Sequence, residues 1–288
     1  MTTGDDPNQG PHTGTQPARS GYAPKPAKSG GEIVHEARKA IKRMRALARL
    51  LHYELGEQEF ERVNDSLRAA AQRLSGARDA EVRVATLEHL RSKHPKALAH
   101  EGIERLCEHL KRERDEAGEP ADTQEVLADI ANMRNHLARW NLVDPDFDAL
   151  APGLRQIYRQ GRRRYRGVQH KHGRTPEDLH NWRKRTKALY YALDMLGGAG
   201  AKGARRTTQR ANSLGDLLGE EHDLWMLSVY IEQHPHALGD DEDARRALSK
   251  QIRQRRRRLR KRALRAGARL YKRKPGAFTR RMESALTR

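Results

Sequence analysis

Two short stretches of the chain repeat the same order of residue types that bind phosphate. Each has the form H-x-x-R-K-x-x-K, and the two align without gaps at an offset of 145 residues. The matching residues are His35, Arg38, Lys39 and Lys42 in the first stretch and His180, Arg183, Lys184 and Lys187 in the second. Arginine can hold two phosphate oxygens at once, lysine supplies a compact point charge, and imidazole can donate a hydrogen bond. The repeat therefore predicts two sites with the same chemistry, the binding of phosphate groups.

The spacing of these residues places them on one side of a helix. At 100° per residue the first set, extended by Arg49, falls within about 60° of one line, and Tyr191 extends the second set in the same way. An ordinary solvated helix face mixes charges of opposite sign, and like charges at this spacing cost a few tenths of a kcal/mol per pair. Both motifs contain such repelling charges, and a bound polyanion would relieve the repulsion in each. Both histidines are expected in the first turns of their helices, where free backbone N–H groups also favour phosphate.

A second pair of short motifs follows the first pair in the same order. Arg78-Asp79 and His222-Asp223 end two similar stretches at an offset of 144 residues. Two motifs repeated in order at nearly equal spacing indicate a duplicated helical unit. We therefore divide the chain into a disordered tail over residues 1–30, a first helical unit over residues 31–144 and a second over residues 145–288.

The segments that carry these motifs have the pattern of amphipathic helices. Apolar residues between Ile33 and Leu51 recur at i, i+3, i+4 and i+7, which is the spacing of one helix face. Aromatic residues make up only 5% of the chain, a poor composition for a sheet protein. The fold class predicted is all-α. The further helices predicted lie near residues 57–74, 78–92, 97–117, 122–141, 147–169, 176–196, 203–218, 220–233 and 242–273.

The net charge is large and unevenly distributed. The 288 residues include 58 Lys and Arg against 38 Asp and Glu, a formal net charge of +20. Residues 31–144 hold 20 basic and 21 acidic residues, whereas residues 145–288 hold 35 basic and 15 acidic ones. Part of the surplus flanks an apolar seam between Leu154 and Val168, and its members are Arg155, Arg159, Arg162, Arg163 and Arg166. A polyanion is the partner expected from this balance.

Other classes of protein fit the sequence poorly. No run approaches the ~20 apolar residues that span a bilayer, and the first ten residues lack the apolar core of a signal peptide. The single cysteine, Cys107, cannot form an intramolecular disulfide or a cysteine-based zinc site. The spaced histidine pairs 170/172 and 234/236 lack further ligands, so no metal and no cofactor is predicted. We expect a soluble cytoplasmic protein without membrane contact.

The two histidine motifs with their trailing Arg-Asp and His-Asp pairs resemble the CHAD family, the "conserved histidine α-helical domain", over about residues 32–285. The family pattern H-x-x-R-K-x-x-K-R-x-R-x-x-x-R adds Arg43 and Arg45 to the candidates in the first unit. In the second unit Tyr190-Tyr191 stands where the family usually has Arg-Tyr, with Asp194 in the position of the following acid. The resemblance implies two four-helix bundles related by a pseudo-twofold axis, with basic helix faces lining a central groove or pore. It also implies non-catalytic binding of inorganic polyphosphate, often at polyphosphate granules.

Three alternatives remain open at this point. A basic helical surface with a high isoelectric point is also typical of nucleic-acid-binding proteins, although no aromatic residues are interleaved with the basic stripes. Some helical bundles relay phosphoryl groups through an exposed histidine, which would leave acid-labile phosphohistidine on His35 or His180. Hydrolysis of polyphosphate is less favoured, because metal-dependent phosphate chemistry uses clustered carboxylates and the basic stripes contain almost none.

Overall fold

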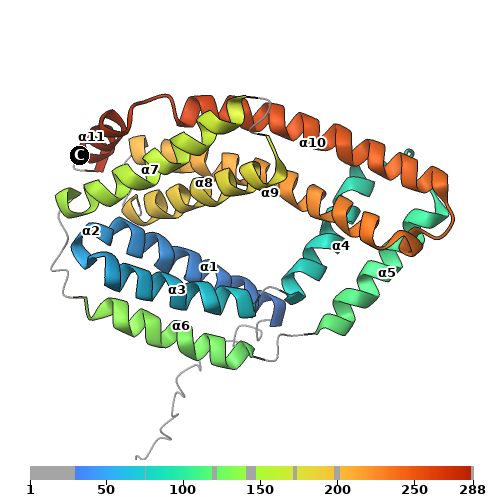
Figure 1. The fold of residues 1–288 in the computed structure, drawn as a ribbon, viewed down its shortest axis with the longest axis horizontal. Helices are drawn as coiled ribbons and strands as arrows, with labels where there is room; N and C mark the ends of the chain where they lie inside the picture. Colours follow the sequence, from blue (N-terminus) through green and yellow to red (C-terminus); the bar gives the residue numbers. More distant parts are fainter. Residues whose placement is uncertain are drawn as a thin grey trace, which may run out of the picture.

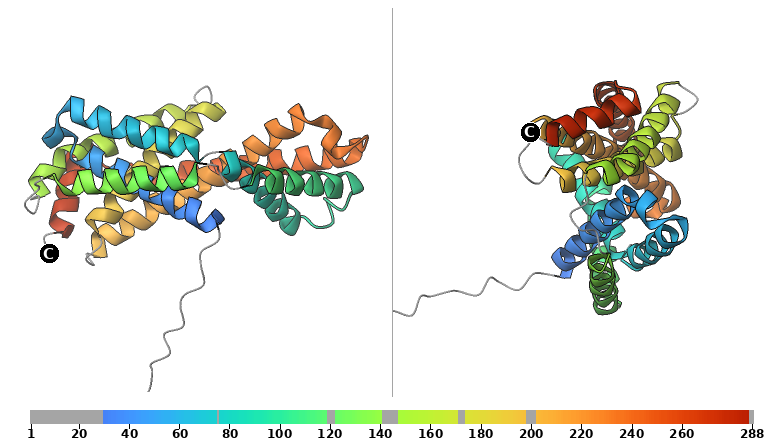
Figure 2. Two further views of the ribbon diagram at one scale, coloured as in Figure 1. Left: turned by 90° about the horizontal axis from the view of Figure 1, so that it is seen from below. Right: turned by 90° about the vertical axis from the view of Figure 1, so that its left-hand side faces the viewer.

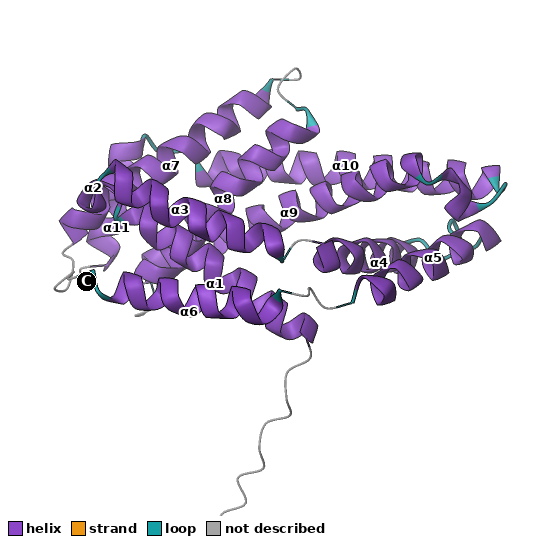
Figure 3. Cartoon of the chain, turned by 60° about the horizontal axis from the view of Figure 1, so that its bottom comes forward, coloured by secondary structure: helices purple, strands orange, loops and turns teal. Residues whose placement is uncertain are grey.

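The computed structural model describes residues 30–74, 76–118, 122–140, 147–170, 174–197 and 202–286. All regular secondary structure in these ranges is helical, with no strand (Figure 3). The predicted all-α fold class is therefore confirmed. The predicted tail, residues 1–30, lies outside the described residues except for Gly30, which begins the first helix.

The helices that the structure describes are, in chain order, α1 (Gly30–Leu50), α2 (His52–Leu55), α3 (Glu57–Arg73), α4 (Gly76–Lys93), α5 (Glu101–Ala117), α6 (Thr123–Ala138), α7 (Phe147–Gln169), α8 (Pro176–Leu196), α9 (Lys202–Gln233), the 3₁₀ helix η2 (Pro235–Leu238), α10 (Glu242–Leu270) and α11 (Pro275–Leu286). They form an elongated, flattened molecule, in which α4, α5 and the first part of α10 extend to one end (Figures 1 and 2). No helix within the described ranges combines the length and the apolar character needed to cross a membrane.

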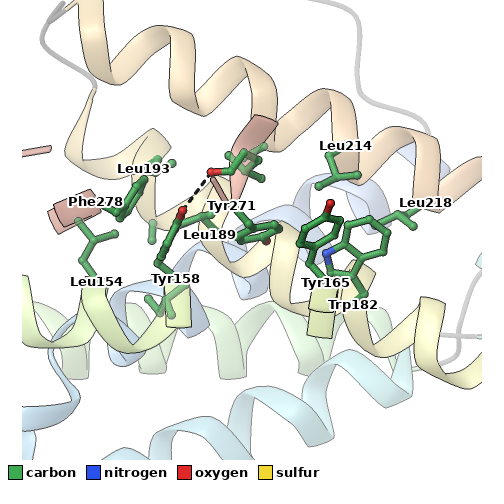
Figure 4. Close-up of a cluster of buried hydrophobic side chains, with 14 of the residues drawn as sticks. Leu154, Tyr158, Tyr165, Trp182, Leu189, Leu193, Leu214, Leu218, Tyr271 and Phe278 are labelled. Carbon is green, nitrogen blue, oxygen red and sulfur yellow. Dashed lines mark hydrogen bonds between the residues drawn. The ribbon is translucent and has the colours of Figure 1, made fainter. Parts of the chain in front are cut away.

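The buried side chains form three hydrophobic cores. The first joins α1, α3 and α6, and the second joins α7, α8 and the first half of α9 with the end of α10 and α11. Figure 4 shows the aromatic centre of this second core, where Tyr158 and Phe278 stack with ring centroids 3.8 Å apart. Trp182 is fully buried there.

The third core is built from both predicted units of the chain. Residues of α4 and α5, from the first unit, pack there against the second half of α9, η2 and the first half of α10. The boundary predicted at residue 144/145 therefore does not separate the hydrophobic cores. The pseudo-twofold relation between two bundles stays a prediction.

The sequence pattern predicts two helices, 203–218 and 220–233, where the structure has the single helix α9. A glycine inside a helix costs about 1 kcal/mol relative to alanine, and Gly219 suggested a break. Leu214 and Leu218 are buried in the second core, and Leu224 and Leu227 in the third. Burial of a leucine contributes about 2 kcal/mol, so the apolar face that runs through both cores outweighs the cost of one glycine.

A glycine also permits the close crossing of α1 and α7. A Cβ atom built on Gly153 would lie 2.0 Å from the carbonyl oxygen of Leu50, so no larger residue fits at this position. The crossing fixes the C-terminal end of α1 against α7. It thereby sets the position of the first histidine motif relative to the second half of the chain.

Candidate functional site

A cavity of about 1060 Å³ lies between α1, α3, α4, α8 and α9, and we call it the central cavity. These helices enclose the middle of the molecule in Figure 1. Its charged wall residues are the cations Arg38, Lys42, Arg45, Arg49, Arg68, Arg183, Lys184, Arg185 and Lys187, the histidines His35, His89 and His180, and the acids Asp216, Glu220 and Asp223. The wall thus holds nine arginines and lysines and three carboxylates, and the three carboxylates all belong to α9.

The first histidine motif supplies one wall of the central cavity from α1. Five of its seven predicted residues line the cavity, and they are His35, Arg38, Lys42, Arg45 and Arg49. Lys39 and Arg43 do not, because at 100° per residue they lie about 90° and about 130° around the helix from the line of Arg38 and Arg49, on which the wall is centred. Lys39 instead lies 3.7 Å from Glu36, and Arg43 donates a hydrogen bond to Asp194 of α8 at 3.1 Å.

Arg38 has a structural contact as well as its place in the wall. Its guanidinium donates hydrogen bonds to the backbone carbonyl oxygens of Ala71, at 3.3 Å, and Leu74, at 2.8 Å. The last carbonyls of a helix have no partner within the helix. Arg38 therefore satisfies the C-terminal end of α3, and a substitution there would disturb folding as well as the wall.

The second histidine motif supplies the facing wall from α8. All five predicted residues line the central cavity, and they are His180, Arg183, Lys184, Lys187 and Tyr191. The Nζ of Lys187 donates hydrogen bonds to Asp216 at 2.8 Å and Asn212 at 3.2 Å. The buried Nε of Arg183 has no hydrogen-bond partner among the residues that the structure describes. Arg183 is thus a cation with an unsatisfied donor that faces the cavity.

Two glycines of α9 make room for these cations. A Cβ atom on Gly215 would lie 2.7 Å from Cε of Lys187, and one on Gly219 would lie 3.5 Å from Nε of Arg183. The glycines are four residues apart and so lie on the same face of α9. The face without side chains is what lets α8 lay two long cationic side chains across α9 and into the cavity.

The five arginines predicted on the flank of α7 do not line the central cavity. Arg162 donates a hydrogen bond to the backbone oxygen of Tyr271 at 3.1 Å, and Arg155 lies near Gly276. Arg159, Arg163 and Arg166 are exposed on the same helix. The amphipathic pattern predicts the five on one flank, and two of them, Arg155 and Arg162, lie at the end of α10 and α11. Arg163 lies outside the cavity but near α8, since the pKa of Arg185 is lowered by desolvation and also by the charges of neighbouring arginines that include Arg163.

Three further basic residues line the cavity without having been predicted. Arg185 lies within the second motif but outside the line of its predicted residues. It still lines the cavity, because the cavity wall includes a wide arc of the surface of α8. Arg68 of α3 and His89 of α4 carry no repeat or spacing signal. Only the packing of α3 and α4 against the motif helices brings them into the wall.

Burial and mutual repulsion act on the cavity cations. Desolvation and the charges of Arg45 and Arg185 lower the pKa of Arg49 to about 10, so it stays protonated at neutral pH at a cost in free energy. Desolvation, with the charges of neighbouring basic residues, also lowers the pKa values of Arg45, Lys184 and Arg185. The cavity therefore holds positive charge that its own carboxylates do not balance.

The second trailing motif meets the second histidine motif in space. The rings of His180 and His222 lie with centroids 4.3 Å apart, and Nδ1 of His180 is buried with no hydrogen-bond partner among the described residues. Desolvation, followed by the charges of Lys184 and Arg183, lowers the pKa of His180 to about 4. Desolvation and the neighbouring His180 lower the pKa of His222 to about 4 as well. Both rings are therefore neutral at pH 7 in the unliganded protein.

The prediction that the two histidines occupy first helical turns is wrong. α1 begins at Gly30 and α8 at Pro176, with Thr175 as the N-cap, so His35 and His180 lie in the second turn. Their backbone N–H groups follow the four that lack a partner within the helix. The histidines can contribute only through their side chains. Among the described residues, no group of three or more His, Cys, Asp or Glu side chains could hold a metal ion.

Comparison with known proteins supports the family resemblance that the two histidine motifs indicate. The family model described as "CHAD domain" matches residues 24–232. No curated protein and no solved structure matches the chain significantly. The matched range contains α1 to α8 and all of α9 but its last residue, and thus every residue that lines the central cavity, while α10 and α11 lie beyond it. Since the match covers more than half of the 288 residues, the chain belongs to the CHAD family.

Proposed function

We propose that this protein binds inorganic polyphosphate in its central cavity and does not transform it chemically. The observation that carries the proposal is the convergence of two motifs, 145 residues apart in sequence, on one cavity. The CHAD family is linked with polyphosphate-related proteins, which favours this polyanion over others. The polymer repeats the one group that both walls are suited to hold, a phosphate with its negative charge.

The charge arrangement supports binding of a thin, flexible polyanion. Neutralising phosphates with lysine and arginine releases counterions, which supplies most of the affinity in the analogous case of nucleic acids. Four cavity cations, Arg68, Arg183, Lys184 and Arg185, form no ion pair with a carboxylate among the described residues. A phosphate chain would supply the negatively charged partners that these four side chains lack in the described part of the chain.

The carboxylates of the cavity favour binding over hydrolysis. Asp216 is engaged by Lys187 at 2.8 Å, and Glu220 by Nε of Arg255 at 2.5 Å. Metal-assisted phosphate hydrolysis uses carboxylates grouped around the ion, whereas these two are committed to cations on different helices. We therefore propose binding without hydrolysis. As the resemblance to the CHAD family implies, we further propose that the protein acts in the cytoplasm, in association with polyphosphate granules.

The proposal is tested by competition between polyanions. Long-chain polyphosphate, single-stranded RNA and duplex DNA are titrated at equal phosphate concentration and ~150 mM salt, where exposed charges are well screened. We expect polyphosphate to bind most tightly. A preference for single-stranded RNA, or a preference for duplex DNA that is lost when Arg183 and Lys184 of the cavity are replaced by glutamate, would refute the proposal.

A charge-reversal pair locates the binding in the cavity. The variant Arg183→Glu with Lys184→Glu removes two cations of the cavity wall, while Arg257→Glu with Arg258→Glu makes the same change on exposed residues of α10. We expect the cavity pair to lose at least tenfold more polyphosphate affinity, since each lost charge-assisted contact is worth about 1.5–3 kcal/mol. Equal losses would show a diffuse cationic surface in place of a site.

A further inference from the structure

A second basic surface lies outside the central cavity, where α7 meets the C-terminal end of α10 (Figure 1). The two helices are joined by Tyr271, whose backbone oxygen accepts a hydrogen bond from Arg162 and whose ring lies against Gly161. Both helices carry exposed arginines, among them Arg159 and Arg166 of α7 and Arg258, Arg262, Arg265 and Arg269 of α10. We call these six residues the outer basic surface.

The four arginines of α10 form one stripe. Their spacing of four, three and four residues places them on one side of the helix, and at 1.5 Å per residue the stripe is about 16 Å long. The sequence contains no acidic residue between Asp243 and Glu283. The stripe is therefore free of the acids that usually neutralise an exposed helix face.

Other arginines of α10, unlike the exposed arginines of the stripe, are paired with a carboxylate that the structure describes. Arg256 and Arg260 both bind the buried carboxylate of Glu221, with Nε to Oε1 distances of 3.0 and 2.9 Å. Glu221 is only 1% exposed. These cations fasten α10 to α9, whereas the stripe points away from that contact and has no carboxylate partner among the described residues.

The shape and composition of the outer basic surface indicate what it binds. It is open, so a wide polyanion can approach it, whereas a duplex is too wide to enter a cavity of about 1060 Å³. The large hydrophobic side chains exposed in the described part of the chain are Tyr53 and Met226, and neither lies on α7 or α10. Stacking on aromatic side chains is the usual means of holding unpaired bases. The surface therefore offers arginine contacts to phosphates and, within the described residues, no exposed aromatic ring on which unpaired bases could stack.

We propose that the outer basic surface binds the backbone of duplex nucleic acid without sequence preference, independently of the central cavity. A duplex carries one charge per about 1.7 Å of its axis, dense enough for successive arginines of the α10 stripe to meet phosphates, with Arg159 and Arg166 adding positive charge on α7. The stripe also lies beyond residues 24–232, the range matched to the CHAD domain. The protein then has two polyanion sites of different width, a narrow one inside and a broad one outside.

The test uses three variants with a fluorescent 20-base-pair DNA duplex and, separately, with polyphosphate. The outer variant carries Arg258→Glu, Arg262→Glu and Arg265→Glu. A control variant with the same change in charge carries Lys96→Glu, Arg112→Glu and Arg134→Glu, all at exposed positions in the first half of the chain. The cavity variant is Arg183→Glu with Lys184→Glu. Fluorescence anisotropy is measured at about 50 mM salt, where phosphate contacts are strong.

We expect the outer variant to lose at least about tenfold in duplex affinity, with a salt slope shallower by up to about 0.9 for each lost phosphate contact. The control and cavity variants should retain duplex affinity within about threefold, while the cavity variant alone loses polyphosphate binding. If the outer variant unfolds by circular dichroism, Arg262→Gln with Arg265→Gln takes its place.

Three results would overturn the inference. Equal losses in the outer and control variants would mean that net charge alone attracts the duplex. Loss of duplex binding in the cavity variant would place nucleic acid at the cavity mouth. Tighter binding to vesicles rich in anionic lipid than to the duplex, weakened by the outer substitutions, would make the surface a membrane contact. The first and third results leave polyphosphate binding in the cavity untouched, and the polyphosphate titration of the cavity variant tests that proposal on its own, so the two proposals fail separately.

Discussion

Removing the charge of Arg49 should stabilise the unliganded protein and weaken polyphosphate binding. Arg49 lies in the wall of the central cavity, where desolvation and the charges of Arg45 and Arg185 lower its pKa from the usual value of an arginine to about 10. Both the folded and the unfolded protein hold it protonated at pH 7, well below either pKa. At 1.36 kcal/mol for each pH unit, the lowered pKa means that folding costs the charged guanidinium on the order of 3 kcal/mol.

The hydrogen bonds of Arg49 offset part of this cost. Its guanidinium donates to the backbone oxygen of Arg45 at 3.1 Å and to Oδ1 of Asn64 at 3.4 Å. The net value of each bond is about 1 kcal/mol. The variant Arg49→Gln should therefore raise the free energy of unfolding by roughly 1 kcal/mol. With a denaturant slope of about 2–3 kcal/mol/M, the urea midpoint moves up by about 0.4 M.

Polyphosphate titrations of the same variant provide the second measurement. Loss of one phosphate contact should make the slope of log affinity against log salt shallower by about 0.7–0.9. The control is Arg49→Lys, which keeps the charge and should keep both the lower stability and the salt slope. An Arg49→Gln protein that is less stable than the wild type, with unchanged polyphosphate binding, would refute the idea that the cavity stores unbalanced charge for its ligand.

Three further predictions concern the same cavity. Polyphosphate affinity should rise about tenfold from pH 7 to pH 5, because a bound polyanion favours the imidazolium form of His180. Its pKa of about 4 in the free protein then moves up toward or above the usual range of a histidine when polyphosphate is bound. The increase in affinity should be smaller in His180→Ala, and an affinity that calorimetry finds independent of pH would contradict the prediction. Gly215→Ala should preserve or raise the stability of the protein through helix propensity yet lower its polyphosphate affinity severalfold. The new Cβ would lie 2.7 Å from Cε of Lys187 and displace the Lys187 ammonium. Unchanged polyphosphate affinity in the same titration would show that Lys187 makes no contact with the ligand. Polyphosphate at 100 times its dissociation constant should raise the free energy of unfolding by about 2.7 kcal/mol, and a thermal denaturation midpoint unaffected by polyphosphate would argue against binding to the folded state.

The sequence allowed a correct prediction of which residues share a helix face, because helical periodicity is local. His180, Arg183 and Lys187 lie together on α8, as their spacing required. Periodicity does not tell which face of one helix looks toward another. The spacing of the five candidate arginines of α7, such as Arg159, predicts a shared flank, but none of the five lines the cavity.

Features that depend on packing between distant segments carried little or no sequence signal. Arg68 enters the cavity because α3 packs on α1, and nothing in its neighbourhood marks it out from other exposed arginines. The continuity of α9 through Gly219 results from burial in two cores, which outweighs a local preference of about 1 kcal/mol. Such balances between local and tertiary terms are settled only by the assembled fold.

The distribution of charge along the chain is a poor guide to where a polyanion binds. Residues 31–144 are nearly neutral, yet they supply five of the nine basic residues in the central cavity, namely Arg38, Lys42, Arg45, Arg49 and Arg68. The second half, with its surplus of basic residues, supplies four, all from α8. The surplus must therefore lie largely elsewhere, and the exposed arginines of α7 and α10 are part of it. The excess of +20 therefore fits the two polyanion sites that we propose, one in the cavity and one on an open helix surface, better than the cavity alone.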